Sequence, residues 1–312
     1  MSRDVRLGDR IFRRVTEAAG LVVLVTIAAI AVFLVAKAVP AFRVSGWGFF
    51  SEKQWFPDAT PAKFGVAALA FGTVLAAVLA LVIVIPVAVG AALAVTELAP
   101  KRLGTWLGHL IDLLAAVPSV VFGLWGIFFL IPRMKGLEMW LARYLDFIPL
   151  FSNPSHTFGK SVFAAAVVLA IMTLPIVAAI AREVFRQVPQ GNREAALALG
   201  ATRWEMIRMA VLPPSKGGVV GGIMLGLGRA LGETIAVALV LGATYGITFH
   251  VLQPGGNTIA ANIALKFGEA GATGRSALIA SGLVLFAITL AVNMAARTIV
   301  YRSTRVSREA AV

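Results

Sequence analysis

Two residues of opposite charge, Arg229 and Glu233, lie within a long apolar stretch of the sequence. A spacing of four residues places both side chains on one face of an α-helix. An isolated arginine at the centre of a bilayer costs about 2.5–3.5 kcal/mol on insertion scales, so pairing with Glu233 would lower that cost. The guanidinium is always charged and matches the paired oxygens of an oxyanion. Two interpretations follow: a salt bridge that locks two helices together, or a positive station on the path of an anion.

Glycines surround the charged pair and recur at four-residue intervals in two series. The first series is Gly218, Gly222 and Gly226, and the second is Gly228 and Gly232. Because glycine has no side chain, the backbone of a neighbouring helix can approach such a face closely. We therefore predict that the helix bearing the charged pair packs tightly against other helices.

The polar segment directly before this stretch contains signals for two short helices. Asn192 is a suitable N-cap for the first helix, and Gly200 stands where a helix-ending glycine is expected. Thr202 and Glu205 have the spacing of a capping box that begins the second helix, and the following pair of prolines is expected to end it. Such a folded loop is either a docking surface for a soluble partner or an amphipathic pair of helices that rests on the bilayer.

The composition of the chain indicates a membrane protein. Its 312 residues are 59% hydrophobic with a mean hydropathy of +0.88, which is more apolar surface than a soluble domain of this length buries. The apolar residues form runs long enough to cross a hydrocarbon core of about 30 Å. The predicted spans cover residues 18–39, 66–95, 107–131, 162–181, 217–241 and 277–299. We therefore predict an all-α fold: a polytopic membrane protein with six transmembrane helices.

The net charge of +13 allows nucleic-acid binding, but basic loops are also how helical membrane proteins set their orientation. Most lysines and arginines lie in the alternate segments that contain both termini and residues 182–216. We therefore predict that these segments face the cytoplasm, and we expect no nucleic-acid partner. In the opposite segments, aromatic residues such as Trp47 and Trp140 form either a belt at the membrane interface or a contact for an external partner.

Other residue types that carry out chemistry are scattered. Gly159, Lys160 and Ser161 resemble the end of a nucleotide-binding loop, but Pro154 occupies the position of its first glycine. The histidines show no metal-ligand spacing and the chain has no cysteine, so we predict no metal site. Asp112 is either a gate residue or a side chain that reaches the membrane interface. Without paired carboxylates or a catalytic triad, the chain alone is predicted not to be an enzyme and to hold no cofactor.

Within the polar loop, an acidic residue followed by two alanines, a glycine four residues later and a Leu-Pro pair resemble the EAA loop of type I ABC importer permeases. The residues of this motif are Glu194, Ala195, Ala196, Gly200, Leu212 and Pro213. Ala210 replaces the isoleucine that is usual in the motif, and the resemblance covers about residues 66–297. It implies that the loop forms coupling helices that sit in a groove of a separate ATPase subunit, which binds ATP and Mg²⁺.

The string LGLGRALGETIAV, which contains Arg229 and Glu233, is similar to one branch of that family, the permeases of phosphate-specific ABC importers. The string IDLLAAVPSVVFGLWG is similar to the same branch. The order of the spans and the long outer segment after the third span resemble the larger of that branch's two homologous permeases. The resemblance implies that Arg229 and Glu233 lie on the phosphate path. It also implies the partners: a homologous second permease, two copies of an ATP-binding subunit, a periplasmic or surface-anchored phosphate-binding protein, and the lipids of a bacterial inner membrane.

Three alternatives stay open at this point: a permease for another oxyanion such as sulfate or molybdate, a secondary transporter or channel that works alone, and a membrane-anchored scaffold. In each case the simplest division of the chain has one membrane domain. Residues 1–65 are expected to hold a cytoplasmic segment, the first transmembrane helix and a first periplasmic segment. Residues 66–299 form the expected permease domain with its cytoplasmic coupling loop at 183–216, and residues 300–312 form a cytoplasmic tail.

Overall fold

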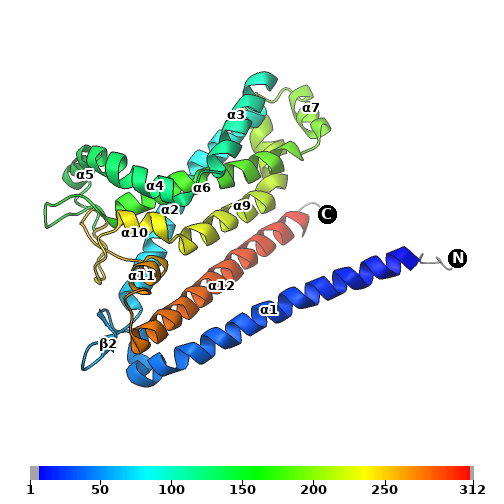
Figure 1. Cartoon of the computed structure of the whole chain (residues 1–312). Coiled ribbons are helices and arrows are strands. Elements are labelled where there is room, and N and C mark those ends of the chain that lie inside the picture. Colours follow the sequence, from blue (N-terminus) through cyan, green and yellow to red (C-terminus); the bar gives the residue numbers. More distant parts are fainter. Residues whose placement is uncertain (1–6, 310–312) are drawn as a thin grey trace.

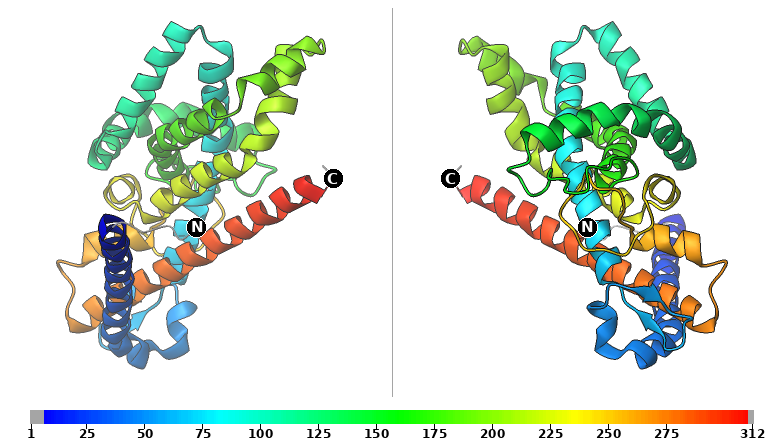
Figure 2. Two further views of the ribbon diagram at one scale, coloured as in Figure 1. Left: turned by 90° about the vertical axis from the view of Figure 1, so that its right-hand side faces the viewer. Right: turned by 90° about the vertical axis from the view of Figure 1, so that its left-hand side faces the viewer.

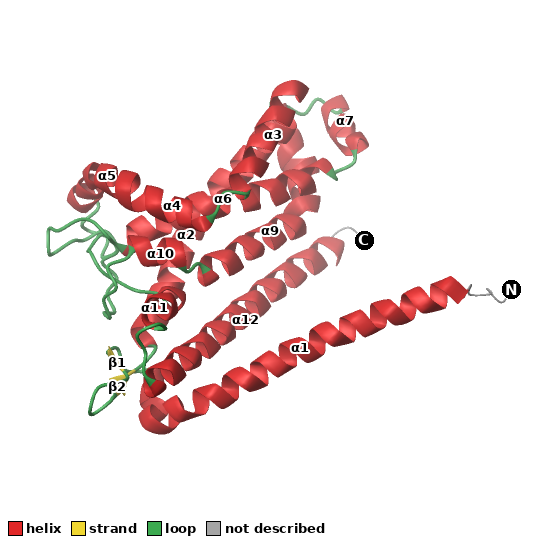
Figure 3. Cartoon of the chain, viewed as in Figure 1, coloured by secondary structure: helices red, strands yellow, loops and turns green. Residues whose placement is uncertain are grey.

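The computed structural model describes residues 7–309, which form an almost entirely helical assembly (Figures 1 and 3). The α-helices are α1 (Leu7–Ser45), α2 (Ala67–Leu93), α3 (Lys101–Ala115), α4 (Ser119–Trp125), α5 (Ile131–Tyr144), α6 (Val162–Arg186), α7 (Gln190–Ala198), α8 (Arg203–Met206), α9 (Leu212–Gly232), α10 (Ile235–Val240), α11 (Ile259–Lys266) and α12 (Ala272–Glu309). The remaining elements are the 3-10 helix η1 (Gly46–Phe50), the π-helical segments η2 (Ala94–Leu98), η3 (Gly126–Leu130) and η4 (Ile207–Val211), and the strands β1 (Trp55–Phe56) and β2 (Lys63–Phe64). Residues 1–6 and 310–312, which belong to the predicted N-terminal segment and tail, lie outside the described residues.

Within the described residues, six helical stretches are long and apolar enough to cross a membrane. They are Gly8–Phe50, Ala67–Leu98, Ser119–Tyr144, Val162–Arg186, Arg203–Gly232 and Ala272–Ala295. Each combines a run of apolar residues with a length that exceeds the 20 or so residues needed to span a bilayer. The predicted all-α fold with six membrane-spanning helices is confirmed.

The bounds of two predicted spans are wrong. The predicted third span, 107–131, crosses a break in the helix, because α3 ends at Ala115 and Pro118 precedes the first residue of α4. Proline lacks a backbone N–H and disfavours helical geometry in the residue before it, so the chain restarts a helix there. The predicted fifth span, 217–241, is likewise divided between α9, which ends at Gly232, and α10.

Helix α6 lies at the centre of the assembly, with α2, α3 and α9 packed around it (Figure 2). On α2, Ala76, Ala80 and Ala88 are at most 1% exposed, and their spacing in multiples of four residues places them on one face. Small side chains on one face allow two helix backbones to approach closely. The core therefore holds α2 and α9 in a defined position against α6 and against each other.

We call the end of the assembly that carries β1 and β2 the hairpin end, and the opposite end the α7 end. At the hairpin end α1 and α12 meet, and Ser276 Oγ both donates to the carbonyl of Lys37 at 2.8 Å and accepts from the Ala41 N–H at 3.0 Å. The carboxylate of Asp58, in the turn between the strands, accepts from two N–H groups at the start of α12, both at 2.9 Å. These contacts fix the start of α12, whereas its other end diverges from α1 (Figure 1).

A second carboxylate orders the segment before β1. The backbone N–H groups of Gln54 and Lys53 donate to Glu52 Oε1 at 3.0 and 2.7 Å, and they hold the pKa of Glu52 below its usual value. Lys63 lies 3.6 Å from the other carboxylate oxygen and acts in the same direction. The hairpin end is therefore a compact cap that is ordered by backbone-directed hydrogen bonds.

Candidate functional site

The predicted pairing of Arg229 with Glu233 is wrong. Helix α9 ends at Gly232, and Glu233 has extended backbone angles (φ −66°, ψ 127°), so the two side chains do not share a helical face. None of the ion pairs between described residues joins them. Glu233 instead is 9% exposed and accepts a long hydrogen bond, 3.4 Å, from the N–H of Ala236 at the start of α10. The carboxylate satisfies a free N–H of the new helix, which favours the break over a continuous span.

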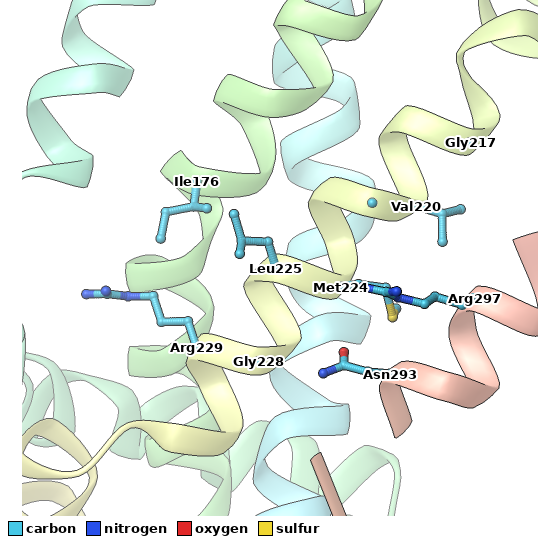
Figure 4. A pocket seen from close by; sticks show the side chains of 10 residues that line it. Ile176, Gly217, Val220, Met224, Leu225, Gly228, Arg229, Asn293 and Arg297 are labelled. Atoms are coloured by element: carbon cyan, nitrogen blue, oxygen red, sulfur yellow. The ribbon is translucent and has the colours of Figure 1, made fainter. Parts of the chain in front are cut away.

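Arg229 lines a cavity of about 840 Å³ between α6, α9 and α12. The lining residues are Ile176, Gly217, Val220, Gly221, Met224, Leu225, Gly228, Arg229, Asn293 and Arg297. In Figure 4, Asn293 and Arg297 point from α12 toward α9, whereas Arg229 leaves α9 on the side of Ile176. The wall is therefore mostly apolar and glycine-rich, with two guanidinium groups and one amide as its polar groups. Among these lining residues, the two arginines are the charged groups to which an anion in the cavity could bind.

The glycines of α9 divide into a packed face and an open face. A Cβ added at Gly218, Gly222 or Gly226 would lie 2.5 to 2.9 Å from side-chain carbons of α6, which is too close for real contacts. The predicted tight packing of this helix is therefore confirmed for that face. At Gly221 and Gly228, in contrast, an added Cβ would meet no described atom within 4 Å. The open face forms part of the cavity wall and brings its backbone to the surface of the cavity.

The polar loop folds into helices, but with different ends from those predicted. Helix α7 begins at Gln190 after Pro189, so Asn192 lies inside the helix rather than capping it. A proline at the start of a helix costs no intrahelical hydrogen bond, because the first N–H groups of a helix have no partner within it. The predicted capping box is confirmed: Thr202 Oγ1 accepts from the Glu205 N–H, and Glu205 accepts from the Thr202 N–H at 2.8 Å.

The pair Pro213-Pro214 does not end the second helix as predicted. Helix α8 continues through η4 into α9, so the two prolines lie in the first turn of α9 within one long helical stretch, Arg203–Gly232. The π-helical segment η4 directly precedes them, and prolines are tolerated in the first turn of an α-helix. The loop is thereby joined directly to the span that carries Arg229.

The residues of the EAA-like motif divide between the surface and the interior of the α7 end. Glu194, Ala195 and Gly200 are exposed, while Ala196 and Leu212 pack against a buried cluster beneath the loop. Gly200 has a φ of +85°, a left-handed conformation that L-residues with a side chain rarely adopt. Beside it, the side chain of Leu199 is 90% exposed. An apolar side chain presented so fully on a folded loop is typical of a docking surface.

Two long-range ion pairs at the α7 end were missed by the sequence analysis. Arg193 pairs with Glu97 at 2.9 Å, and Arg182 pairs with Asp112 at 2.8 Å. Asp112 therefore pairs with a nearly buried arginine, a contact that neither proposed role for it had anticipated. The partners lie 96 and 70 residues apart in sequence, so no local spacing could have linked them. The only available signal was that each acidic residue stands next to an apolar run.

The region that forms the cavity, the folded loop and the spans around them matches a known protein family in sequence. Residues 85–305 match the model described as "Binding-protein-dependent transport system inner membrane component". The chain belongs to this family. The matched region contains all the residues that line the cavity and the whole loop from α7 to η4.

Curated relatives of this family member match over nearly its full length. "Phosphate transport system permease protein PstC 2" of Mycobacterium tuberculosis is 46% identical over 303 residues, which cover 95% of the chain and 93% of the relative. "Phosphate transport system permease protein PstC" of Xylella fastidiosa is 40% identical over 308 residues, with 97% and 93% covered. Both relatives thus align with this chain over more than nine tenths of their length.

A solved structure shows the same fold in a more distant protein. A chain from "Inward facing conformations of the MetNI methionine ABC transporter" superposes with a TM-score of 0.51 at 18% identity. The match covers 74% of this chain and 91% of the MetNI chain. As an inner membrane component of a binding-protein-dependent transport system, the chain is a multi-pass membrane protein.

Proposed function

We propose that this chain is the larger of two homologous permeases in an ATP-driven phosphate importer of a bacterial inner membrane. The observation that carries the proposal is the similarity, at 36–46% identity over at least 93% of each chain, to proteins named phosphate transport system permeases. The same similarity disfavours a sulfate or molybdate permease. A transporter or channel that works alone is disfavoured by the family and by the folded loop, which such a protein would not need.

Arg229 is the proposed phosphate-contacting residue of this chain. Among the described residues no carboxylate lies within ion-pair distance of it, so its guanidinium is available to an oxyanion in the cavity. Glu233 lies beside the path and organises the break between α9 and α10 through its contact with Ala236. The negative charge of Glu233 near Arg229 would also weaken the binding of phosphate to Arg229 and so favour its release.

The exposed face of the loop from α7 to α8 is the proposed docking surface for a separate ATPase. It presents Glu194, Ala195 and Gly200 together with Leu199 and Trp204, whose side chains are 90% and 63% exposed. Leu212 and Pro213 lie at the start of α9 and would pass a displacement of the loop into that helix. ATP and Mg²⁺ would bind to two copies of the partner, and no cofactor is assigned to this chain.

The proposed orientation places both termini and the α7 end in the cytoplasm. Arg186, Arg203 and Arg208 lie in or beside the loop, as expected for a cytoplasmic segment. The hairpin end then faces a periplasmic or surface-anchored phosphate-binding protein. A second permease would close the open side of the cavity, and membrane lipids would cover the apolar surface of α1.

Transport by the reconstituted complex tests the substrate. Vesicles that contain the chain with its partner permease, ATPase and binding protein are expected to take up labelled phosphate only when ATP is supplied. Excess unlabelled phosphate should abolish the signal, and equal excesses of sulfate and molybdate should leave it intact. If sulfate or molybdate competes with phosphate, that oxyanion is the substrate. Uptake of phosphate without ATP would contradict an ATP-driven importer.

The backbone of Gly200 provides a test of the docking surface. Gly200→Val is expected to lower the amount of ATPase that co-purifies with the chain by about tenfold, because a β-branched residue costs about 1–2 kcal/mol or more at this positive φ and displaces the turn. Gly191→Val is the matched control, because Gly191 lies in the same loop with open space and an ordinary φ. Equal recovery of ATPase with both variants would contradict the assignment of this surface.

A further inference from the structure

The α7 end contains a largely buried ion pair that joins the loop to two spans. Arg193 of α7 donates from Nε to Glu97 Oε2 at 3.1 Å and from Nη2 to Glu97 Oε1 at 2.9 Å. The side chains of Arg193 and Glu97 are 16% and 4% exposed. This two-point geometry fixes the relative orientation of the two groups as well as their distance.

The same guanidinium also binds the end of α6. Arg193 Nη2 donates to the carbonyl of Phe185 at 2.7 Å, and Nη1 donates to the carbonyl of Val188. The Phe185 carbonyl also accepts from the Val188 N–H at 3.3 Å, and the negative end of a helix dipole favours a cation. Arg193 therefore connects three segments: α7, the end of α6, and η2, which is the π-helical end of α2.

An apolar cluster surrounds this connection. Its buried members are Ala92, Ala181, Phe185, Val188, Met206, Ile207 and Val211, which come from α2, the end of α6, α8 and η4. Ala196 of α7 and Leu212 of α9 pack against the cluster. The loop is thus packed onto the ends of the spans rather than tethered to them, and relative sliding would open a void in the cluster.

The connection extends to α3. A Cβ added at Gly104 would lie 2.7 Å from the carbonyl oxygen of Val95, so α3 contacts the backbone of η2 directly. Further along α3, both carboxylate oxygens of Asp112 accept from Arg182 of α6, at 2.8 and 3.0 Å. The α7 ends of α2, α3 and α6 are therefore joined to one another as well as to α7.

Stability alone is a poor explanation for the Arg193–Glu97 pair. Desolvation offsets most of the attraction in a buried ion pair, and apolar residues of similar volume often stabilise a protein as well or better. An ion pair with two-point geometry has a different advantage, because it permits one relative placement of its partners. Because the pair lies between the proposed docking loop and two spans, it would keep the loop in one position relative to both spans.

We propose that Arg193 and Glu97 form a clamp that makes α7, η2 and the adjoining end of α6 one rigid block, so that a push on α7 moves α2 and α6 together. This inference rests on the proposed function, because the push comes from the proposed ATPase. Arg193 is a positioning residue: its side chain points into the block, so docking of the ATPase does not depend on it. Without the clamp, α7 moves while the spans lag behind.

Coupling of transport to ATP hydrolysis tests the clamp in the full reconstituted complex. Arg193→Gln and, separately, Glu97→Gln are expected to lower the phosphate transported per ATP hydrolysed by about tenfold, while the ATPase still co-purifies. Arg13→Gln is the matched control, because Arg13 forms an exposed pair with Glu17 on α1, with side chains 81% and 62% exposed. An unchanged ratio, or loss of the ATPase from both clamp variants, would overturn the proposal.

A distance measurement tests the rigid block without disturbing the clamp. The chain has no cysteine, so spin labels can be placed at cysteines introduced at Leu98 of η2 and Gln190 of α7, both exposed. The distance between the labels is expected to be the same without nucleotide and with ATP trapped, and to broaden when Arg193→Gln is added. A distance that changes with nucleotide in the labelled parent would refute the block. Failure of the proposed function is separate, since it would appear as no ATP-dependent phosphate uptake by the unsubstituted complex.

Discussion

Arg229→Ala is expected to lower phosphate uptake by about 100-fold while the chain still assembles with its partners. A guanidinium offers two parallel hydrogen bonds to an oxyanion, and hydrogen bonds to charged groups contribute about 1.5–3 kcal/mol each. Loss of about 3 kcal/mol corresponds to about 100-fold, since 1.4 kcal/mol is tenfold. Because Arg229 is exposed to the cavity and has no carboxylate partner among the described residues, its removal leaves no buried charge unpaired. Uptake of labelled phosphate into vesicles, normalised to assembled complex, measures the effect.

Arg229→Lys separates charge from geometry in the same assay. Lysine keeps the positive charge but lacks the planar fork, so uptake is expected to fall between that of the unsubstituted chain and that of Arg229→Ala. Full uptake by Arg229→Ala would remove Arg229 from the phosphate path. Loss of the partner subunits from Arg229→Ala would instead assign Arg229 a role in the assembly of the complex.

Gly72→Ala is expected to destabilise the chain by about 3 kcal/mol, because there is no room for a side chain at this position. A Cβ added there would lie 2.1 Å from the carbonyl oxygen of Asn257, a backbone atom that cannot rotate away. The segment that carries Asn257 is also held in place, since Thr73 Oγ1 accepts from the Ile259 N–H at 3.0 Å. The midpoint of thermal unfolding of the detergent-solubilised chain measures the loss.

Gly90→Ala is the matched control on the same helix. No described atom lies within 4 Å of a Cβ added at Gly90, so the substitution should be neutral or stabilise α2 by up to about 1 kcal/mol through helix propensity. Equal midpoints for Gly72→Ala and Gly90→Ala would contradict this prediction, because they would show that the backbone at Asn257 can move away from α2 with little loss of stability.

The all-α class and the six spans could be predicted because they depend on hydropathy and length, which are local properties of the sequence. Their bounds failed at two places for physical reasons that local patterns do not contain. The predicted third span is interrupted at Pro118, and the predicted fifth span is interrupted after Gly232. Pro213 and Pro214, in contrast, lie inside one long helical stretch. Whether a proline interrupts a helix depends on how the surrounding turns satisfy the freed carbonyls.

The candidate site was predicted in part. Arg229 was singled out by its charge within an apolar run, and the structure places it in the wall of the cavity of about 840 Å³. Its predicted partner was wrong, since Glu233 turns to the start of α10 once α9 ends. A four-residue spacing implies a shared face only where the helix continues, and the helix break at Gly232 was not visible in the apolar pattern.

The sequence by itself determined the membrane class, the number of spans, the EAA-like loop with its capping box, and the arginine of the cavity. Each depends on residue types within a few turns of one another, so composition and spacing were sufficient. Only the tertiary structure decided that Glu97 meets Arg193, that Asp112 meets Arg182, and that one face of α9 packs while the other stays open. Those contacts join segments far apart in the chain, and the packing of α2, α3 and α9 around α6 is what brings them together.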